Sequence, residues 1–234
     1  MKIIDFHSHV LPQIDDGSKS IEMSKLMLEE AVQQNVDIMV ATPHFYAERS
    51  SIESFLEKRK AAGEFLREQL QGCVPRLILG SETAFFSGIG SADGIERLCI
   101  ENTRFLLLEM PFREWGSYDF REIDELICRG IIPIIAHVER YYRFQKSKHA
   151  VEELMEFPIY FQVNAESLLD WRMKGKVLKL FKDKKVQLLG SDCHNLENRA
   201  PNLKKGRDVL ERKLGKGYLD AIDRLGEKIL GLTE

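Results

Sequence analysis

The beginning of the chain, Asp5-Phe6-His7-Ser8-His9, places two histidines one residue apart behind a short apolar run. Such a run predicts a β-strand, and because alternate side chains of a strand share a face, Asp5, His7 and His9 are expected to lie together. Two converging neutral imidazoles can bind a transition metal such as Zn, Mn, Fe or Ni. Alone, the pair could equally be two polar loop histidines.

Further apolar runs also end in residues that can bind a metal. These are His44 in ATPH, Glu82 in GSE, Glu109 in LLEMP, His137 in AHVER, and Asp192 and His194 in SDCH. Any one of them could be a solvated acid or a turn histidine, but their recurrence at equivalent positions favours one shared site. Five of the six histidines lie in such segments, whereas His149 is expected on the solvated face of a helix.

Asp16 follows the histidine pair in Ile14-Asp15-Asp16-Gly17-Ser18 and completes the set of candidates, although turn formation or helix capping would also explain it. Its neighbour Asp15 is expected to be structural. Nine candidates exceed what one open catalytic metal needs and imply two or three ions. Mixed histidine and carboxylate ligands suit Mn, Fe or Zn better than Ca or Mg.

The periodicity of apolar residues predicts alternating strands and helices, which would hold these candidate ligands in place. The expected strands are Lys2–Phe6, Val36–Ala41, Arg76–Gly80, Phe105–Leu108, Ile131–Ala136, Ile159–Val163 and Val186–Leu189. The expected helices are Ser20–Gln34, Ser51–Gln71, Asp119–Arg129, Lys148–Phe157, Ser167–Asp183, Asn202–Leu214 and Tyr218–Leu230. Periodicity fits a barrel or a doubly wound sheet, but ligands at the ends of many strands favour the barrel.

Composition places the chain among ordinary globular proteins, with 234 residues, 44% hydrophobic residues and a net charge of −3. Residues 1–234 are expected to form a single domain. Lysines and arginines are dispersed, so no nucleic-acid partner is expected. No signal peptide or membrane insertion is expected either, which predicts a cytoplasmic protein. The four cysteines (Cys73, Cys99, Cys128 and Cys193) are widely spaced and expected to be reduced thiols.

Six motifs in order, HSHxLPxIDDG, ATPH, GSE, LEMPF, HxERY and GSDxHN, resemble the polymerase-and-histidinol-phosphatase (PHP) superfamily. More closely, they resemble its manganese-dependent protein tyrosine phosphatases of capsule and exopolysaccharide operons, the CpsB/YwqE family. The similarity runs from about Met1 to Arg199. It implies an α/β fold, a distorted (β/α)7 TIM-like barrel, with three divalent metal ions, Mn foremost and Fe or Zn as alternatives.

The resemblance also distributes the ligands and names a substrate. One ion would be held by His7, His9, Asp192 and Glu82, a second by Glu82, Glu109 and His137, and a third by Asp16, His44 and His194. The implied partner is a phosphotyrosine protein, notably the tyrosine-rich tail of a bacterial autophosphorylating tyrosine kinase.

Phosphate-ester hydrolysis needs a nucleophile, charge neutralisation and a stable leaving group. Clustered metals lower the pKa of bound water from about 16 to about 7 and clamp the reacting oxygens, while tyrosinate, with a pKa of about 10, leaves readily. Arg140 and Arg199 closely follow ligand candidates and match family arginines that bind phosphate. As bare features they could be surface residues. Asp5 could orient His7 or His9.

A rival mechanism is suggested by Cys193 and Arg199, which match the Cys-x5-Arg pattern of thiol-based tyrosine phosphatases. No glycine lies between them, although such phosphate loops rely on close backbone amides. Asp192 beside the thiol would also disfavour a thiolate. The metal-dependent route is therefore favoured.

Three other functions remain open at this point. A histidinol-phosphatase-like enzyme for small phosphate esters would have a similar metal site, a nuclease would need a basic and aromatic groove, and a non-catalytic kinase-binding protein would not need an intact ligand set. The rim loops Phe45–Ser51, Phe85–Asp93, Phe112–Tyr118 and Tyr141–Lys146 carry aromatics that either hold a phosphotyrosine ring or pack the barrel top.

Overall fold

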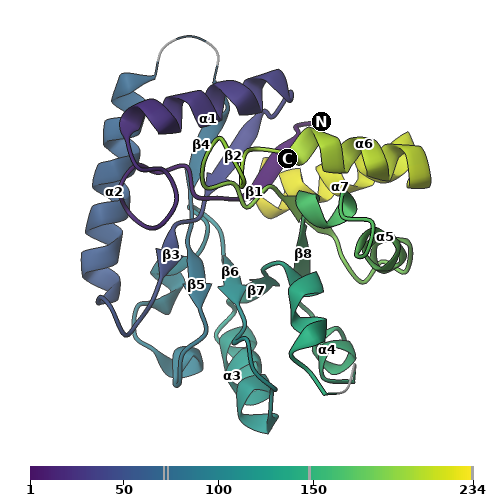
Figure 1. The fold of residues 1–234 in the computed structure, drawn as a ribbon. Coiled ribbons are helices and arrows are strands. Elements are labelled where there is room, and N and C mark those ends of the chain that lie inside the picture. Colours follow the sequence, from purple (N-terminus) through teal and green to yellow (C-terminus); the bar gives the residue numbers. More distant parts are fainter. Residues whose placement is uncertain (71, 73, 147–148, 233–234) are drawn as a thin grey trace.

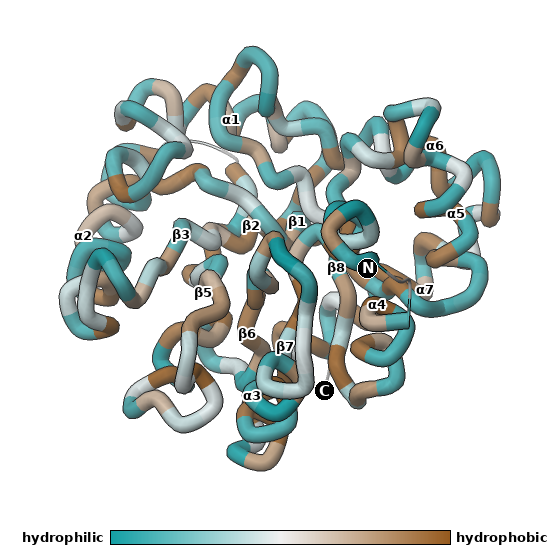
Figure 2. Tube along the Cα trace, turned by 60° about the horizontal axis from the view of Figure 1, so that its bottom comes forward, coloured by the Kyte–Doolittle hydropathy of each residue, from teal (hydrophilic) through white to brown (hydrophobic). Residues whose placement is uncertain are grey.

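Parallel strands occupy the middle of the molecule and helices surround them (Figures 1 and 2). The computed structural model describes residues 1–70, 72, 74–146 and 149–232; Cys73 and the expected helix ends Gln71 and Lys148 lie outside them. The strands are β1 (Ile4–Ser8), β2 (Ile38–Ala41), β3 (His44–Phe45), β4 (Arg76–Leu79), β5 (Glu82–Ala84), β6 (Phe105–Glu109), β7 (Ile132–Ile135), β8 (Tyr160–Asn164) and β9 (Leu188–Gly190).

These nine short strands make up the seven strand positions, or staves, of a barrel. Two of the staves each consist of two strands, β2 with β3 and β4 with β5. The strands pair in parallel in the orders β1-β2-β4 and β3-β5-β6-β7-β8-β9. β3 resumes the path of β2 just after Pro43, which has no N–H to donate to a ladder. β5 resumes the path of β4 after Gly80 and Ser81.

The last stave meets the first. Asp192 N–H donates to His7 O at 2.8 Å, and His9 N–H donates to Cys193 O at 2.9 Å, which joins the end of β9 to β1. Between β4 and β6 the ladder is replaced by a loop, where Glu101 N–H donates to Leu79 O. The expected distorted barrel of seven β/α units is confirmed.

The helices cover the outside of this barrel. They are α1 (Ile21–Gln33), α2 (Ile52–Gln69), α3 (Ser117–Cys128), α4 (His149–Leu154), α5 (Lys174–Lys182), α6 (Leu203–Leu214) and α7 (Lys216–Ile229). Short 3-10 helices are η1 (Ile89–Ser91), η2 (Ile95–Leu98), η3 (Val138–Arg143) and η4 (Ala165–Leu168). Within the described part of the chain, no helix has the length and apolar character needed to cross a membrane.

One expected helix is wrong. The range Ser167–Asp183 divides into η4 and α5, with a non-helical segment between them. The Asp170 carboxylate accepts the N–H of Arg172 at 2.8 Å, a local bond that competes with helix formation. The break gives the chain an exposed corner that carries Trp171, whose side chain is 80% exposed.

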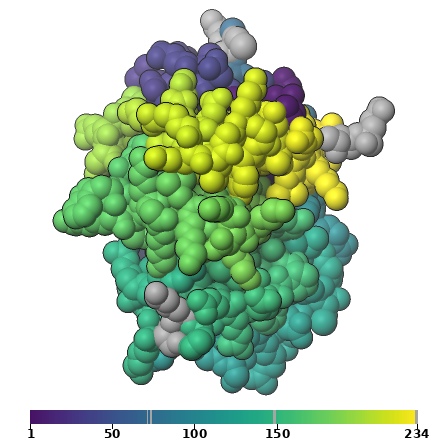
Figure 3. Space-filling model, turned by 90° about the vertical axis from the view of Figure 1, so that its right-hand side faces the viewer, coloured from purple at the N-terminus to yellow at the C-terminus, as the bar shows by residue number. Residues whose placement is uncertain are grey.

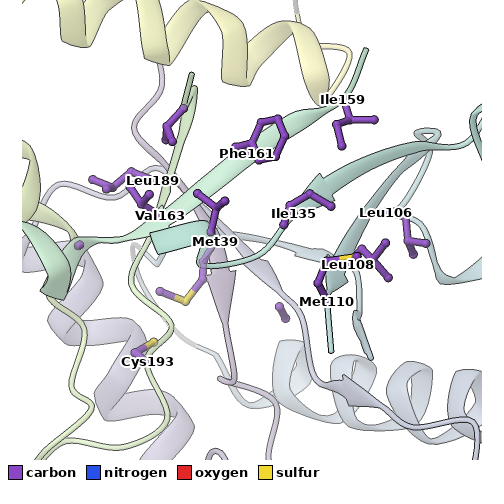
Figure 4. Packing of buried hydrophobic residues seen from close by; sticks show 14 of the residues in the cluster. Met39, Leu106, Leu108, Met110, Ile135, Ile159, Phe161, Val163, Leu189 and Cys193 are labelled. Atoms are coloured by element: carbon purple, nitrogen blue, oxygen red, sulfur yellow. The ribbon is translucent and has the colours of Figure 1, made fainter. Parts of the chain in front are cut away.

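Two apolar layers fix the staves in place. Inside the barrel, Ile4 and Phe6 of β1 pack in one cluster with Val40, Ile134 and the end of α7 at Ile229. The opposite faces of the strands form the larger cluster against the helices, part of which Figure 4 shows from close by. Because apolar residues fill the lower barrel, polar inward side chains are confined to the carboxyl ends of the strands.

The first strand departs from strict alternation. Asp5 pairs with Met39 and Ser8 pairs with Ala41. Over this stretch β1 therefore contains one residue more than β2, as in a β-bulge. Asp5 therefore does not share a face with His7. Its Oδ1 accepts the backbone N–H groups of Ser191 at 2.8 Å and His7 at 3.2 Å, so Asp5 ties strand ends together and orients neither histidine ring.

We predict that Gly190→Ala lowers the free energy of unfolding by about 1 to 3 kcal/mol, the usual cost of overpacking. A Cβ on Gly190 would lie 2.5 Å from His7 Cβ and 2.8 Å from Gln162 Nε2. Urea unfolding of metal-free protein would measure the change. The control is Gly217→Ala in α7, where nothing lies within 4 Å and a small stabilisation is expected. Equal stability of both variants would contradict this account.

Candidate metal centre

Every one of the nine candidate ligands lies at the same end of the barrel. Three overlapping groups have ligand atoms that all fall within 4.8 Å of one another: His9, Asp16, His44 and His194; His7, His9 and Glu82; and His44, Glu82 and Glu109. His137 and Asp192 adjoin these groups. The strand-end pattern thus predicted a set of residues that the fold brings together.

Glu82, at the start of β5, is the centre of the cluster and is only 1% exposed. Its Oε2 lies 3.1 Å from His7 Nε2, 3.2 Å from His9 Nε2 and 3.0 Å from His44 Nδ1. Its Oε1 lies 2.9 Å from His137 Nε2. Four imidazoles from three different staves therefore converge on one carboxylate, which is supplied by a fourth stave.

The outer nitrogens of the first two histidines are held by acceptors. Gln162 Oε1 accepts the backbone N–H of His137 at 2.8 Å and lies 3.2 Å from His7 Nδ1, so His7 Nδ1 carries the hydrogen. Asp15 Oδ2 lies 2.7 Å from His9 Nδ1 and fixes that ring in the same way. Each Nε2 is left to bind a proton or a metal, and the two Nε2 atoms are 3.1 Å apart.

Buried atoms without hydrogen bonds mark the same place. Within the described residues, His44 Nδ1, Glu82 Oε2 and His194 Nε2 are buried and have no hydrogen-bond partner. Asp16, which is 64% exposed, places its Oδ1 3.5 Å from His44 Nε2 and 3.7 Å from His194 Nε2. Burial and the charge of nearby His9 lower the pKa of His194 to about 3, so its ring is neutral. Unpaired nitrogen and oxygen lone pairs facing a common point fit divalent metal ions.

Two arginines, Arg140 and Arg199, donate hydrogen bonds to Asp192 at the edge of the cluster. Arg140 Nη2 donates to Asp192 Oδ2 at 2.7 Å, and Arg199 Nη2 donates to Oδ1 at 2.7 Å. Asn164 Nδ2 also donates to Oδ2 at 2.7 Å. Both guanidinium groups are about one-third exposed and line a cleft of about 350 Å³ together with His44, Tyr46, Glu82, Glu109, Phe112, His137 and Asp192.

Sequence reasoning missed the supporting residues on β8. Gln162 Nε2 donates to Asn164 Oδ1 at 2.9 Å, so the two amides form a chain from His7 to Asp192. A signal was present, because Gln162 and Asn164 are the alternate polar residues of an otherwise apolar run. Asp15 was expected to be structural, and its bonds to His9, to Gly17 N–H and to His44 N–H confirm this.

Two strand ends adopt backbone conformations that side chains rarely take. His137 has φ 32° after β7 and Asp192 has φ 55° after β9. Both are in the left-handed region, where a residue with a Cβ is strained. Strain at two strand ends that face the same cluster is typical of a functional site. His149, by contrast, lies on helix α4 with its side chain 90% exposed, as expected.

Cys193 is unsuited to act as a nucleophile. Its side chain is fully buried and belongs to the same apolar cluster as Met39, Val163 and Leu189 (Figure 4). Burial, followed by the charge of Asp5, raises the pKa of the thiol far above its usual range. The Cys-x5-Arg match to thiol phosphatases is therefore a coincidence of sequence.

The rim aromatics divide into two classes. Phe45, Trp115 and Tyr141 are buried and pack the top of the barrel. Tyr46 and Phe112 are partly exposed and line the cleft. Among the described rim aromatics, Tyr46 and Phe112 are the ones that line the cleft and can touch a ligand in it.

A family model described as capsular polysaccharide synthesis, CpsB/CapC, matches residues 3–228, nearly the whole chain. The chain belongs to the CpsB/CapC family. It is 32% identical to the putative tyrosine-protein phosphatase CapC of Staphylococcus aureus, covering 94% of this chain and 87% of that protein. It is 28% identical to tyrosine-protein phosphatase CpsB of Streptococcus pneumoniae, covering 91% of each.

A solved structure confirms the shared fold. A chain from the crystal structures of YwqE from Bacillus subtilis and CpsB from Streptococcus pneumoniae, described as unique metal-dependent tyrosine phosphatases, superposes with a TM-score of 0.86. The match covers 99% of this chain and 96% of that chain at 24% identity. The CpsB/CapC fold seen here is thus the barrel of those enzymes.

A metal ion bound in this cluster would compete with protons for the same nitrogens. Burial alone would lower the pKa of His9, but Asp15 and Glu82 together raise it to about 10. Burial likewise opposes protonation of His137, yet Glu109 and Glu82 raise its pKa to about 9. At neutral pH the metal-free rings therefore hold protons that a metal ion has to displace.

We predict that Mn²⁺ binding releases protons at pH 7 and tightens as the pH rises toward 9, because both rings hold protons below their raised pKa values of about 10 and 9, and fewer protons then have to be displaced. Titration calorimetry in two buffers of different ionisation enthalpy would count the released protons. Gln162→Leu, which removes the acceptor at His7 Nδ1, should weaken binding by about 10- to 100-fold. Tighter binding at pH 6 than at pH 8 would contradict the competition.

Proposed function

We propose that the protein is a metal-dependent protein tyrosine phosphatase. The observation that carries the proposal is the cleft in which a buried carboxylate ringed by imidazoles, Glu82, adjoins two guanidinium groups, Arg140 and Arg199. Imidazoles and carboxylates suit divalent cations, and guanidinium forks suit the oxygens of a phosphate. The names of its CpsB and CapC relatives support the same activity.

The ligands would divide among three ions, with manganese first among the candidate metals and iron or zinc as alternatives. The proposed sets are His7, His9, Asp192 and Glu82; Glu82, Glu109 and His137; and Asp16, His44 and His194. Glu82 can serve two ions because its two oxygens face different histidines. Ions held there would supply a nucleophilic oxygen at neutral pH and offset the charge of the phosphoryl group.

The chain's own residues would bind and orient the ester. Arg140 and Arg199 would exchange part of their contact with Asp192 for the phosphoryl oxygens, since each guanidinium has further N–H donors that can face the cleft. Phe112 stacks on His137 with ring centroids 5.9 Å apart and presents a flat apolar surface to the cleft. Tyr46, which directly follows β3, lies beside His44 with the two ring centroids 5.2 Å apart.

The proposed substrate is a phosphotyrosine protein. An aryl phosphate fits a cleft bordered by aromatic side chains, and its phenolate leaving group has a pKa of about 10, so no strong general acid is needed. We further propose that residues 1–234 act as one domain and that the partner is a bacterial tyrosine kinase of capsule or exopolysaccharide synthesis. The family's link to capsular polysaccharide synthesis supports that choice of partner.

We predict that the purified protein hydrolyses p-nitrophenyl phosphate and a phosphotyrosine peptide, loses the activity after chelation and recovers it with Mn²⁺. Steady-state kinetics on these substrates, with phosphoserine peptide and histidinol phosphate alongside, would measure preference. A higher kcat/KM on histidinol phosphate than on phosphotyrosine would replace the proposal with a small-molecule phosphoesterase.

Two single variants separate the metal mechanism from a thiol mechanism. Cys193→Ala should keep kcat/KM within about threefold, because the thiol is buried away from the cleft. His7→Ala should lower kcat/KM by at least about 100-fold, since it removes one of the imidazoles at Glu82. Circular dichroism would verify folding of both. An inactive Cys193→Ala that binds Mn²⁺ normally would refute the metal mechanism.

A further inference from the structure

A second cavity, of about 530 Å³, adjoins the catalytic cleft at Arg140 and is lined by none of the candidate metal ligands. It is formed by η3 after β7, by η4 after β8 and by the start of α5, including the exposed corner between η4 and α5. In Figure 3 the green segment that contains η4 and α5 lies at the surface below the yellow C-terminal helices.

This cavity and the cleft share one lining residue. Arg140 lines both cavities, and Asn164 lines the second one. Both donate to the same oxygen, Asp192 Oδ2, at 2.7 Å. A polypeptide with one side chain in the cleft can therefore place a neighbouring residue in this cavity.

Three cationic side chains in the lining of the second cavity each lie over an aromatic ring. Arg143 lies over the Phe144 ring at 5.4 Å, Arg172 over the Trp171 ring at 5.1 Å, and Lys176 over the Tyr142 ring at 3.2 Å. Within the described residues, neither Arg143 nor Arg172 forms an ion pair with a carboxylate. Their guanidinium N–H donors thus remain able to bind an anion.

The carboxylates of the lining are mostly turned to the backbone. Glu139 is only 4% exposed and its Oε1 accepts the N–H of Asn164 at 3.1 Å. Asp170 accepts the N–H of Arg172 at 2.8 Å. Glu166 is the third acid of the lining, and Arg140 is already paired with Asp192. Arg143 and Arg172 are therefore the guanidinium groups of this cavity that can bind an anion.

We propose that this cavity binds a second anionic side chain of the substrate polypeptide, a few residues from the phosphotyrosine that enters the cleft. The inference rests on the proposed phosphatase function and adds a selectivity for flanking sequence. In an extended peptide, residues two or three positions apart are about 7 to 10 Å apart, which suits neighbouring cavities. A glutamate, an aspartate or another phosphotyrosine has the required charge.

The test uses phosphotyrosine peptides with one glutamate, one second phosphotyrosine or one glutamine placed in turn at each position from −4 to +4. We expect kcat/KM to be about threefold to tenfold higher for an anion at one or two positions on a single side, the size of one or two exposed ion pairs. The preference should decline in 0.5 M NaCl. Comparing glutamate with phosphotyrosine shows which anion is preferred.

The double variant Arg143→Gln/Arg172→Gln should abolish this preference. Arg76→Gln, a control that removes one positive charge at the exposed start of β4, should retain it. p-Nitrophenyl phosphate has no flanking residues and measures the catalytic cleft alone, so its kcat/KM should be equal in all three proteins. A preference that is absent from the wild type, or that survives in the double variant, would overturn the subsite. Failure of the wild type on p-nitrophenyl phosphate as well would instead overturn the phosphatase function.

Discussion

The structure depends on one buried carboxylate that is surrounded by imidazoles. Glu82 is almost completely removed from solvent, and four histidine nitrogens lie within 3.2 Å of its oxygens. A charge buried in this way is tolerated only when cations or metal ions compensate it. Because the compensating rings come from three staves and the carboxylate from a fourth, the barrel has to hold all of those strand ends at a common height, which the apolar lower barrel does.

The same constraint explains why the site could be predicted from sequence. Ligands at the ends of parallel strands must follow apolar runs, so His44, Glu82, His137 and His194 are visible as a recurrent pattern. The seven staves and the outer helices follow from the same periodicity. The exact positions of the supporting side chains depend on contacts between distant segments, which periodicity does not predict.

Three departures show what periodicity cannot supply. The β-bulge in β1 turns Asp5 away from His7, although alternation put them together. A local side-chain bond at Asp170 breaks a helix whose sequence is otherwise suitable. Gln162 was overlooked because the pattern was one of histidines and carboxylates, yet its amide oxygen bonds to both a histidine ring and the backbone N–H of His137. In each case one polar group redirects the chain against the local pattern.

The contact between the first and last staves also bears on how the site is made during synthesis. Ser191 bonds to His7 O although 184 residues separate them in sequence. A nascent chain that has left the ribosome only as far as β8 contains His7, His9 and Glu82 but lacks Asp192 and His194. This cluster of candidate ligands is therefore incomplete until the final stave emerges, so any property that needs the whole cluster arises only after the barrel has closed.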